Sequence, residues 1–190
     1  ITKAVTASLM AAAMLTTTVA TIAPMSVSAG QVLGENDFTY KALPWHTCET
    51  NPAKQTFELT SDGTFHVTVK EPGGAAAGGE SRWDLQFRHR NLTFKAGHTY
   101  KIHWEVKVSR PGIQINTKIG NIKGDEEYWN NNNAGPHGGG TWNPIITINS
   151  TEWQKFDSTW TCPQNLEGVE WAFHYGGAGA NQPTPCTPVS

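Results

Sequence analysis

Residues 100–108 read YKIHWEVKV, and this stretch decides the fold class. Apolar residues occupy every second position from Tyr100 to Val108, and charged or polar residues fill the positions between them. A period of two is typical of a strand that buries one face and exposes the other, whereas an amphipathic helix needs a period near 3.6. The stretch therefore predicts a half-buried β-strand.

The same alternation recurs along most of the chain. Residues 82–90 (RWDLQFRHR) alternate apolar and polar residues, and residues 55–60 and 64–70 flank the hairpin turn signal Asp62-Gly63. Further strands are predicted over 113–117, 144–149, 153–161 and 168–175. No segment longer than ten residues has a convincing helical period. These short strands predict an all-β sandwich with little helix.

The remaining segments define the domain organisation. Residues 1–29 carry one charge and no aromatic residue, and end in Val27-Ser28-Ala29, which predicts a secretory signal peptide. A permanent membrane anchor is the alternative, and the small-residue cleavage pattern argues against it. Residues 124–140 are polar and predict a long loop. One binding domain is expected over 30–177, followed by a Gly/Pro/Thr-rich loop or linker over 178–190.

Composition narrows the class of partner and the compartment. The chain has 190 residues, 14 Lys and Arg against 16 Asp and Glu, and a net charge of −2. This charge offers no basic face for phosphates, so nucleic acid is disfavoured as a partner. Export favours a secreted, extracellular protein with no membrane association once the signal is removed, and it permits disulfides.

Three cysteines cannot all pair within one chain. Either one thiol is free and buried, or its partner lies beyond residue 190. A bridge between Cys48 and Cys162 is one possible pairing, and pairings that involve Cys186 are others.

Eight tryptophans are more than a core of this size needs. Trp104 and Trp171 lie within strands among apolar residues of the same parity, so we expect them in the core. Trp153 and Trp160 belong to a strand of less regular parity and are left as core or edge.

A second group of tryptophans has no apolar neighbours that would bury it. Trp45, Trp129 and Trp142 are expected to be exposed on loops, where aromatic side chains in a secreted sandwich most often serve recognition. The alternative is that each folds back over one end of the sandwich.

Trp83 begins a predicted strand whose opposite face carries polar residues. Asp84, Gln86, Arg88 and Arg90 place directional donors and acceptors on that face. Indole rings beside planar polar groups suit a sugar, whose apolar ring face covers an indole while its hydroxyls form hydrogen bonds. An ordinary solvated outer face is the alternative.

The chain resembles family 4 carbohydrate-binding modules over roughly residues 35–177. The kind that it resembles most stands at the N-terminus of cellulosomal family 9 glycoside hydrolases. The resemblance is carried by seven segments in the same order, namely 43–49 (LPWHTCE), 82–90 (RWDLQFRHR), 96–100 (AGHTY), 118–120 (KIG), 127–132 (EYWNNN), 142–144 (WNP) and 173–177 (FHYGG).

This resemblance implies a jelly-roll β-sandwich of two antiparallel sheets that binds β-1,4-glucan chains in a cleft. Trp83 and Trp142 match sugar-stacking positions, and Gln86 and Arg88 match polar positions of the cleft strand. Trp45 and Trp129 are expected at the rim. Residues 133–141 look like an insertion before the second platform.

Further expectations follow from the same resemblance. It implies a structural calcium, with Glu35 as the one ligand that carries over, and no cofactor for catalysis. The family's final acidic strand does not appear before Ser190, so the sandwich is expected without it. The implied partners are β-1,4-glucan and an appended glycoside hydrolase, in an extracellular and cellulosomal setting.

Two other function classes compete with glycan binding. Asp125, Glu126 and Glu127 invite a glycosidase interpretation, in which case catalysis needs two carboxylates held at a fixed separation across the sugar. Adjacent acids in one polar loop are more typical of a solvated segment, so hydrolysis is expected of a domain beyond residue 190. An adhesin or protein-interaction sandwich is the third class.

Overall fold

The computed structural model describes residues 32–33, 45–73, 82–124, 126–130 and 145–177. The chain divides into two units, Ile1–Gly34 and Glu35–Ser190. The predicted signal peptide over 1–29 lies outside the described residues, and the fold reported below is that of the second unit. Within the described residues, no helix combines the length and hydropathy that a membrane span needs.

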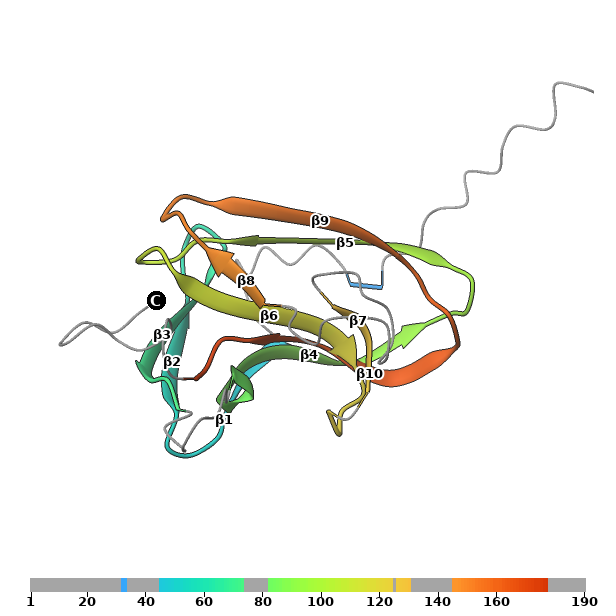
Figure 1. Ribbon diagram of the computed structural model, residues 1–190, viewed down its shortest axis with the longest axis horizontal. Coiled ribbons are helices and arrows are strands. Elements are labelled where there is room, and N and C mark those ends of the chain that lie inside the picture. Colours follow the sequence, from blue (N-terminus) through green and yellow to red (C-terminus); the bar gives the residue numbers. More distant parts are fainter. Residues whose placement is uncertain (1–31, 34–44, 74–81, 125, 131–144, 178–190) are drawn as a thin grey trace, which may run out of the picture. The chain divides into compact units, whose positions relative to one another are not determined.

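Ten strands and one 3-10 turn make up the described part of the second unit (Figure 1). They are β1 (Trp45–Glu49), β2 (Lys54–Leu59), β3 (Phe65–Glu71), the 3-10 turn η1 (Arg82–Asp84), β4 (Leu85–Phe94), β5 (Thr99–Val106), β6 (Ile113–Gly120), β7 (Glu127–Asn130), β8 (Ile145–Ile148), β9 (Gln154–Thr161) and β10 (Leu166–His174). The prediction of an all-β chain is confirmed.

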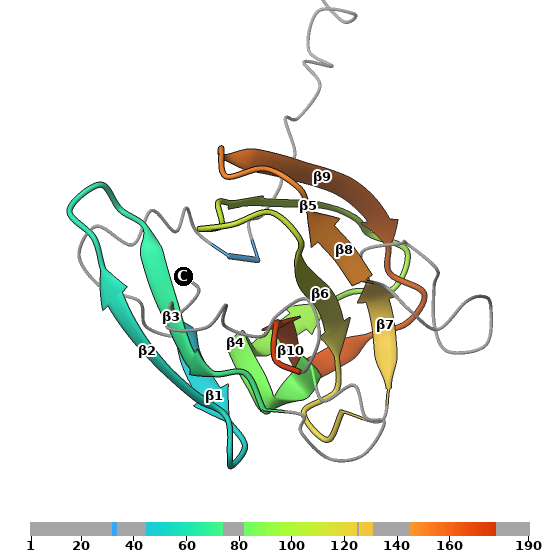
Figure 2. The ribbon, with the colours of Figure 1, turned by 60° about the vertical axis from the view of Figure 1, so that its left-hand side comes forward.

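Every strand pairing is antiparallel. The largest sheet has the order β1-β4-β10-β6-β7, and β8 pairs with β6 as well. Two further sheets have two strands each, β2-β3 and β5-β9, and Figure 2 shows them as separate ribbons. The sequence predicts one second sheet opposite the large one. The structure instead has two separate strand pairs, β2-β3 and β5-β9.

Aromatic side chains join these sheets into a core. The ring centroid of Phe65 in β3 lies 4.2 Å from that of Phe87 in the large sheet. The ring centroid of Trp104 in β5 lies 5.2 Å from that of Phe173. Phe87 and Phe173 are paired residues of β4 and β10, so both contacts fall on one face of the large sheet. We call this the core face, and the opposite face the polar face.

The core tryptophans are where the alternation predicts them. Trp104 and Trp171 are buried, and so is Trp160, which packs on Phe94 with ring centroids 5.3 Å apart. The indole N–H of Trp171 donates a 2.7 Å hydrogen bond to Thr117 Oγ1, which satisfies it within the core. Trp153 precedes β9 and is 47% exposed.

The predicted hairpin forms between β2 and β3. Gly63 has a φ of 82°, the left-handed conformation that glycine adopts without strain, and its N–H donates to the carbonyl of Thr60. The polar segment 124–140, in contrast, does not form one continuous loop, because residues 127–130 form β7.

The possible bridge between Cys48 and Cys162 does not form. Both are free thiols, and Cys162 is fully buried with its Sγ donating to the carbonyl of Gln164. Burial raises the pKa of the Cys162 thiol, which disfavours the reactive thiolate. Cys186 lies outside the described residues.

The pairing of β5 with β9 should depend on pH. His103 Nδ1 lies 2.7 Å from Asp157 Oδ1 in the facing strand, and this hydrogen bond raises the pKa of His103. Because the pKa is raised on folding, the added stability is present below about pH 6.5 and is lost as the pH rises through the folded pKa. We expect an effect below about 1 kcal/mol, since the pair is exposed.

Urea unfolding at pH 5.5 and pH 8.5 measures this effect. The wild type should lose more stability between the two pH values than His103→Gln does. An equal change in both proteins would contradict a role for His103.

Candidate functional site: the polar face of the large sheet

The polar face is built by strand register. One row of paired residues crosses five strands, β1, β4, β10, β6 and β7. In this order the row consists of His46, Arg88, Ala172, Lys118 and Asn130. Directly paired residues of an antiparallel sheet point to the same face. The alternation of residues 82–90 predicts Gln86 and Arg88 on one face of a strand, and the register adds the facing residues of β1, β6, β7 and β10.

A chain of hydrogen bonds links the predicted site residues. Gln86 Nε2 donates to the backbone carbonyl of Trp83 at 2.8 Å, and its Oε1 accepts from Arg88 Nη1 at 3.3 Å. Arg88 Nε donates in turn to His46 Nε2 at 3.0 Å. The structure therefore brings Trp83, Gln86 and Arg88 together, with His46 as a fourth member that sequence reasoning missed.

Trp83 lies in η1 and not in a strand, which corrects the prediction. Trp83 is 50% exposed, although the two residues that follow it, Asp84 and Leu85, are both buried. Backbone hydrogen bonds fix η1 on both sides, from Gly176 N to the carbonyl of Arg82 and from Thr50 N to that of Asp84. An exposed indole on an anchored turn is a preformed apolar surface beside polar groups.

Asp84 does not belong to this face, contrary to the predicted alternation. It is 7% exposed in η1 and lies close to Gly73, where an added side chain would come within 2.7 Å of Asp84 Oδ2. The change from strand to turn at Asp84 breaks the alternation, so parity assigns the face correctly only from Leu85 onward.

Glu170 of the next row interacts with two basic residues of this face. Arg90 Nε donates to Glu170 Oε2 at 3.1 Å, and Lys118 Nζ lies 4.0 Å from Glu170 Oε1. The side chains of Lys118 and Glu170 are 3% and 4% exposed. Alternation assigns Glu170 to the polar side of its strand, but the burial of this ion pair could not be read from one sequence.

His174 is uncharged on this face. Burial, together with the positive charges of Lys118, Arg82 and Arg88, lowers the pKa of His174 to about 3. The imidazole thus stays neutral at any pH suited to a binding measurement, and it can both donate and accept one hydrogen bond.

Two of the predicted rim tryptophans are not exposed. Trp45 is 5% exposed in β1 and stacks on Phe87 with centroids 4.6 Å apart. Trp129 is 2% exposed in β7 and is paired with Ile119, a core-face residue. The expectation of exposure was wrong for both, because aromatic and apolar residues from other strands surround positions that have no apolar neighbours along the chain.

Two other site predictions cannot be compared with the structure. Trp142 and Glu35 lie outside the described residues. Over the described ranges, no cluster of three or more His, Cys, Asp or Glu side chains could hold a metal ion. The calcium expectation stays a prediction.

Two of the three acids of the predicted loop, Glu126 and Glu127, lie among the described residues and differ in exposure. Glu126 is exposed and accepts a 2.5 Å hydrogen bond from the hydroxyl of Tyr128, and Glu127 is buried at the start of β7. Asp125 lies outside the described residues.

Comparison with known proteins decides the family. Residues 30–185 match the model of the CBM4/9 family, which is described as a carbohydrate binding domain. The chain belongs to this family. A solved structure described as "CBM4 structure and function" matches with a TM-score of 0.60 and 19% identity, over 82% of this chain and 92% of that one. The jelly-roll β-sandwich prediction is thereby confirmed.

This CBM4/9 chain is also similar to a cellulose 1,4-beta-cellobiosidase from Acetivibrio thermocellus. The two are 30% identical over 160 residues, which is 75% of this chain and 16% of that enzyme. The similarity therefore covers a small part of the cellobiosidase. Family membership supports a carbohydrate-binding and non-catalytic role for the CBM4/9 domain.

Proposed function

We propose that this CBM4/9 domain binds single β-1,4-glucan chains on the polar face of its large sheet. In this proposal the exposed indole of Trp83 stacks on a sugar ring, and Gln86 and Arg88 form hydrogen bonds with its hydroxyls. The observation that carries the proposal is the half-exposed Trp83 joined by Gln86 to a row of planar polar side chains. Trp142 is proposed as a second platform.

The proposal extends to the parent protein. The domain would bring an appended glycoside hydrolase of family 9 to plant cell-wall polysaccharide, in an extracellular and cellulosomal setting. The similarity to a cellobiosidase that is several times longer supports this arrangement. Hydrolysis would then belong to another domain, in keeping with the family's description as a carbohydrate binding domain.

Affinity electrophoresis tests the binding. In native gels that contain hydroxyethylcellulose or mixed-linkage β-glucan, we expect the protein to migrate more slowly than in gels without polysaccharide. Xylan and mannan gels define the breadth of recognition. Unchanged mobility in all four polysaccharides would reject the proposal, and release of reducing sugar by the purified chain would restore the hydrolase interpretation.

A further inference from the structure

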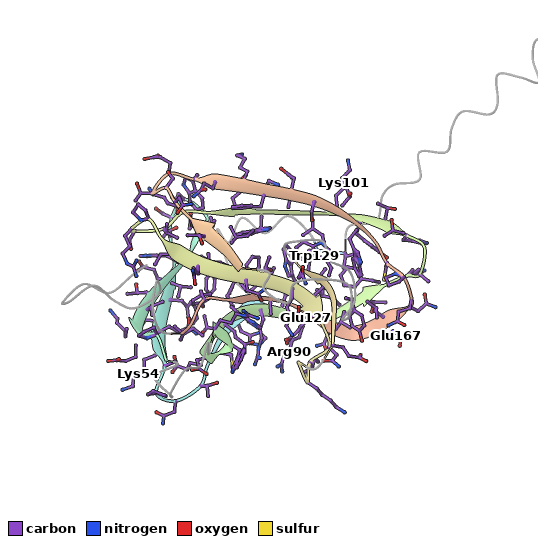
Figure 3. All side chains as sticks on the ribbon, in the orientation of Figure 1. Lys54, Arg90, Lys101, Glu127, Trp129 and Glu167 are labelled. Carbon is purple, nitrogen blue, oxygen red and sulfur yellow. The ribbon has the colours of Figure 1, made fainter. Side chains whose placement is uncertain are left out.

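Two neutral acceptors hold the guanidinium of Arg88. Its Nε donates to His46 Nε2 at 3.0 Å, and its Nη1 donates to Gln86 Oε1 at 3.3 Å. Among the described residues this guanidinium forms no ion pair and no further hydrogen bond. Arg90, which Figure 3 labels on β4, differs because Glu170 neutralises it at 3.1 Å. Arg88 therefore keeps its full charge and, within these residues, has uncommitted donors on Nη1 and Nη2.

The accessible half of the polar face lies on β1 and β4. In the row that crosses the sheet, His46 of β1 and Arg88 of β4 are partly exposed, whereas the residues of β10, β6 and β7 are buried. Gln86 is partly exposed as well, and it links Arg88 to the backbone of the exposed Trp83. A sugar chain beside Trp83 therefore meets Arg88, and the buried Lys118 of the same row stays out of its reach.

The hydrogen bond between Arg88 and His46 fixes the state of the imidazole. Arginine has only donors and keeps its proton in proteins, so His46 Nε2 must offer a lone pair. An imidazolium carries a proton on both nitrogens and has no acceptor. The Arg88 contact therefore selects a neutral His46 whose proton lies on Nδ1.

His46 can act on a ligand through Arg88. Register pairs the two residues directly, so the imidazole stands beside the guanidinium on the same face. A long side chain that is fixed before binding avoids the cost of ordering it on binding. A neutral acceptor also leaves the guanidinium charged, and hydrogen bonds from a charged donor are the stronger kind. Both effects favour a hydrogen bond from Arg88 to a sugar hydroxyl.

We propose that His46 is a positioning residue of the glucan site, which holds Arg88 ready for a sugar hydroxyl and releases it when the imidazole is protonated. This inference rests on the proposed function and deepens it, because it names the group that orients one of the proposed sugar contacts. In this arrangement Arg88 contacts the sugar, and His46 acts only through Arg88.

Protonation of His46 breaks the arrangement. Its Nε2–H would then face the Nε–H of Arg88, with two positive charges in contact. The other titratable or charged groups around this pair are Cys48 on β1, Arg82 on η1, His89 and Arg90 on β4, Glu170 and His174 on β10, and Lys118 on β6. Glu170, the acid of this set, is already engaged by Arg90. The affinity for glucan should therefore fall as the pH falls through the range in which histidine takes up a proton, about pH 8 to pH 5.

Isothermal titration with cellohexaose at about pH 8 and about pH 5 tests the role of His46. At the higher pH, His46→Leu should weaken binding by about 2- to 10-fold, the usual cost of ordering one long side chain. His46→Gln keeps an acceptor for Arg88 Nε and should bind as the wild type does. At the lower pH, the wild type should weaken toward the affinity of His46→Leu, whereas His46→Gln should not change.

His66→Leu is the matched control. His66 lies on β3, outside the large sheet, and its Nδ1 is 2.9 Å from Glu58 Oε1 of the neighbouring strand. This variant should keep the affinity and the pH profile of the wild type. Nitrogen NMR of the histidine rings in the ligand-free protein at about pH 8 should show a proton on His46 Nδ1 and none on Nε2. Thermal unfolding without ligand reports the folding of each variant.

The outcomes separate the two proposals. If the wild type and His46→Leu bind cellohexaose equally well at the higher pH, the positioning role is overturned and glucan binding stands. The same holds if the wild type binds equally well at both pH values, or if His46 Nε2 carries a proton at the higher pH. If the wild type binds neither cellohexaose nor any polysaccharide of the gel panel, the proposed function fails and the positioning role fails with it.

Discussion

Trp83→Ala should abolish retardation of the protein in gels that contain soluble β-glucan. The indole is half exposed in the free protein, so a sugar ring can cover its open face. If covering removes about 100 Å² of apolar surface from water, the contact contributes about 2.5 kcal/mol, or about 70-fold in affinity. Binding in the high micromolar range would then fall below detection. Titration with cellohexaose measures the loss directly.

Trp153→Ala is the matched control for this prediction. Trp153 is exposed to almost the same extent as Trp83, but it lies before β9 and not beside Gln86 and Arg88. The Trp153→Ala variant should therefore bind glucan with the same affinity as the wild type. Equal losses in both variants would show that exposed indoles bind without regard to position, and an unaffected Trp83→Ala would remove Trp83 from the site.

Short-range pattern predicted much of this fold, because one face of each long strand meets the core. In residues 100–108 and 85–90 the parity of each residue alone separates core from polar side chains, as burial of Leu85, Ile102 and Trp104 confirms. The same parity placed Gln86 and Arg88 together on one face. Only their sequence neighbours were needed for that inference.

Long-range strand pairing determines the order of the strands in the large sheet, and this order could not be predicted from one sequence. β10 lies between β4 and β6, although these three strands are not consecutive along the chain. This order brings Glu170 of β10 close to Arg90 of β4 and to Lys118 of β6. Glu127 was misjudged as a loop acid because the polar composition around it hides the short β7. Its pairing with β6 gives this residue its place opposite Gly120.

The second large effect is on stability, and it distinguishes a core tryptophan from a binding one. Trp45→Ala should lower the free energy of unfolding by about 3–5 kcal/mol, the usual cost of removing a buried aromatic side chain. Trp45 is 5% exposed and lies against four aromatic rings. Phe87 stacks on it, and the ring centroids of His89, Trp171 and Phe173 lie 5.2, 5.6 and 6.2 Å from its own. Urea unfolding followed by circular dichroism measures the change.

Trp45→Phe keeps the experiment interpretable if the alanine variant does not fold. A phenyl ring retains the stack on Phe87 and loses only part of the buried area, so its loss of stability should be well below that of Trp45→Ala. Because Trp45 faces the core, Trp45→Phe should keep full affinity for glucan. A variant that stays as stable as the wild type and loses binding would instead place Trp45 among the recognition residues, as its sequence neighbours alone suggest.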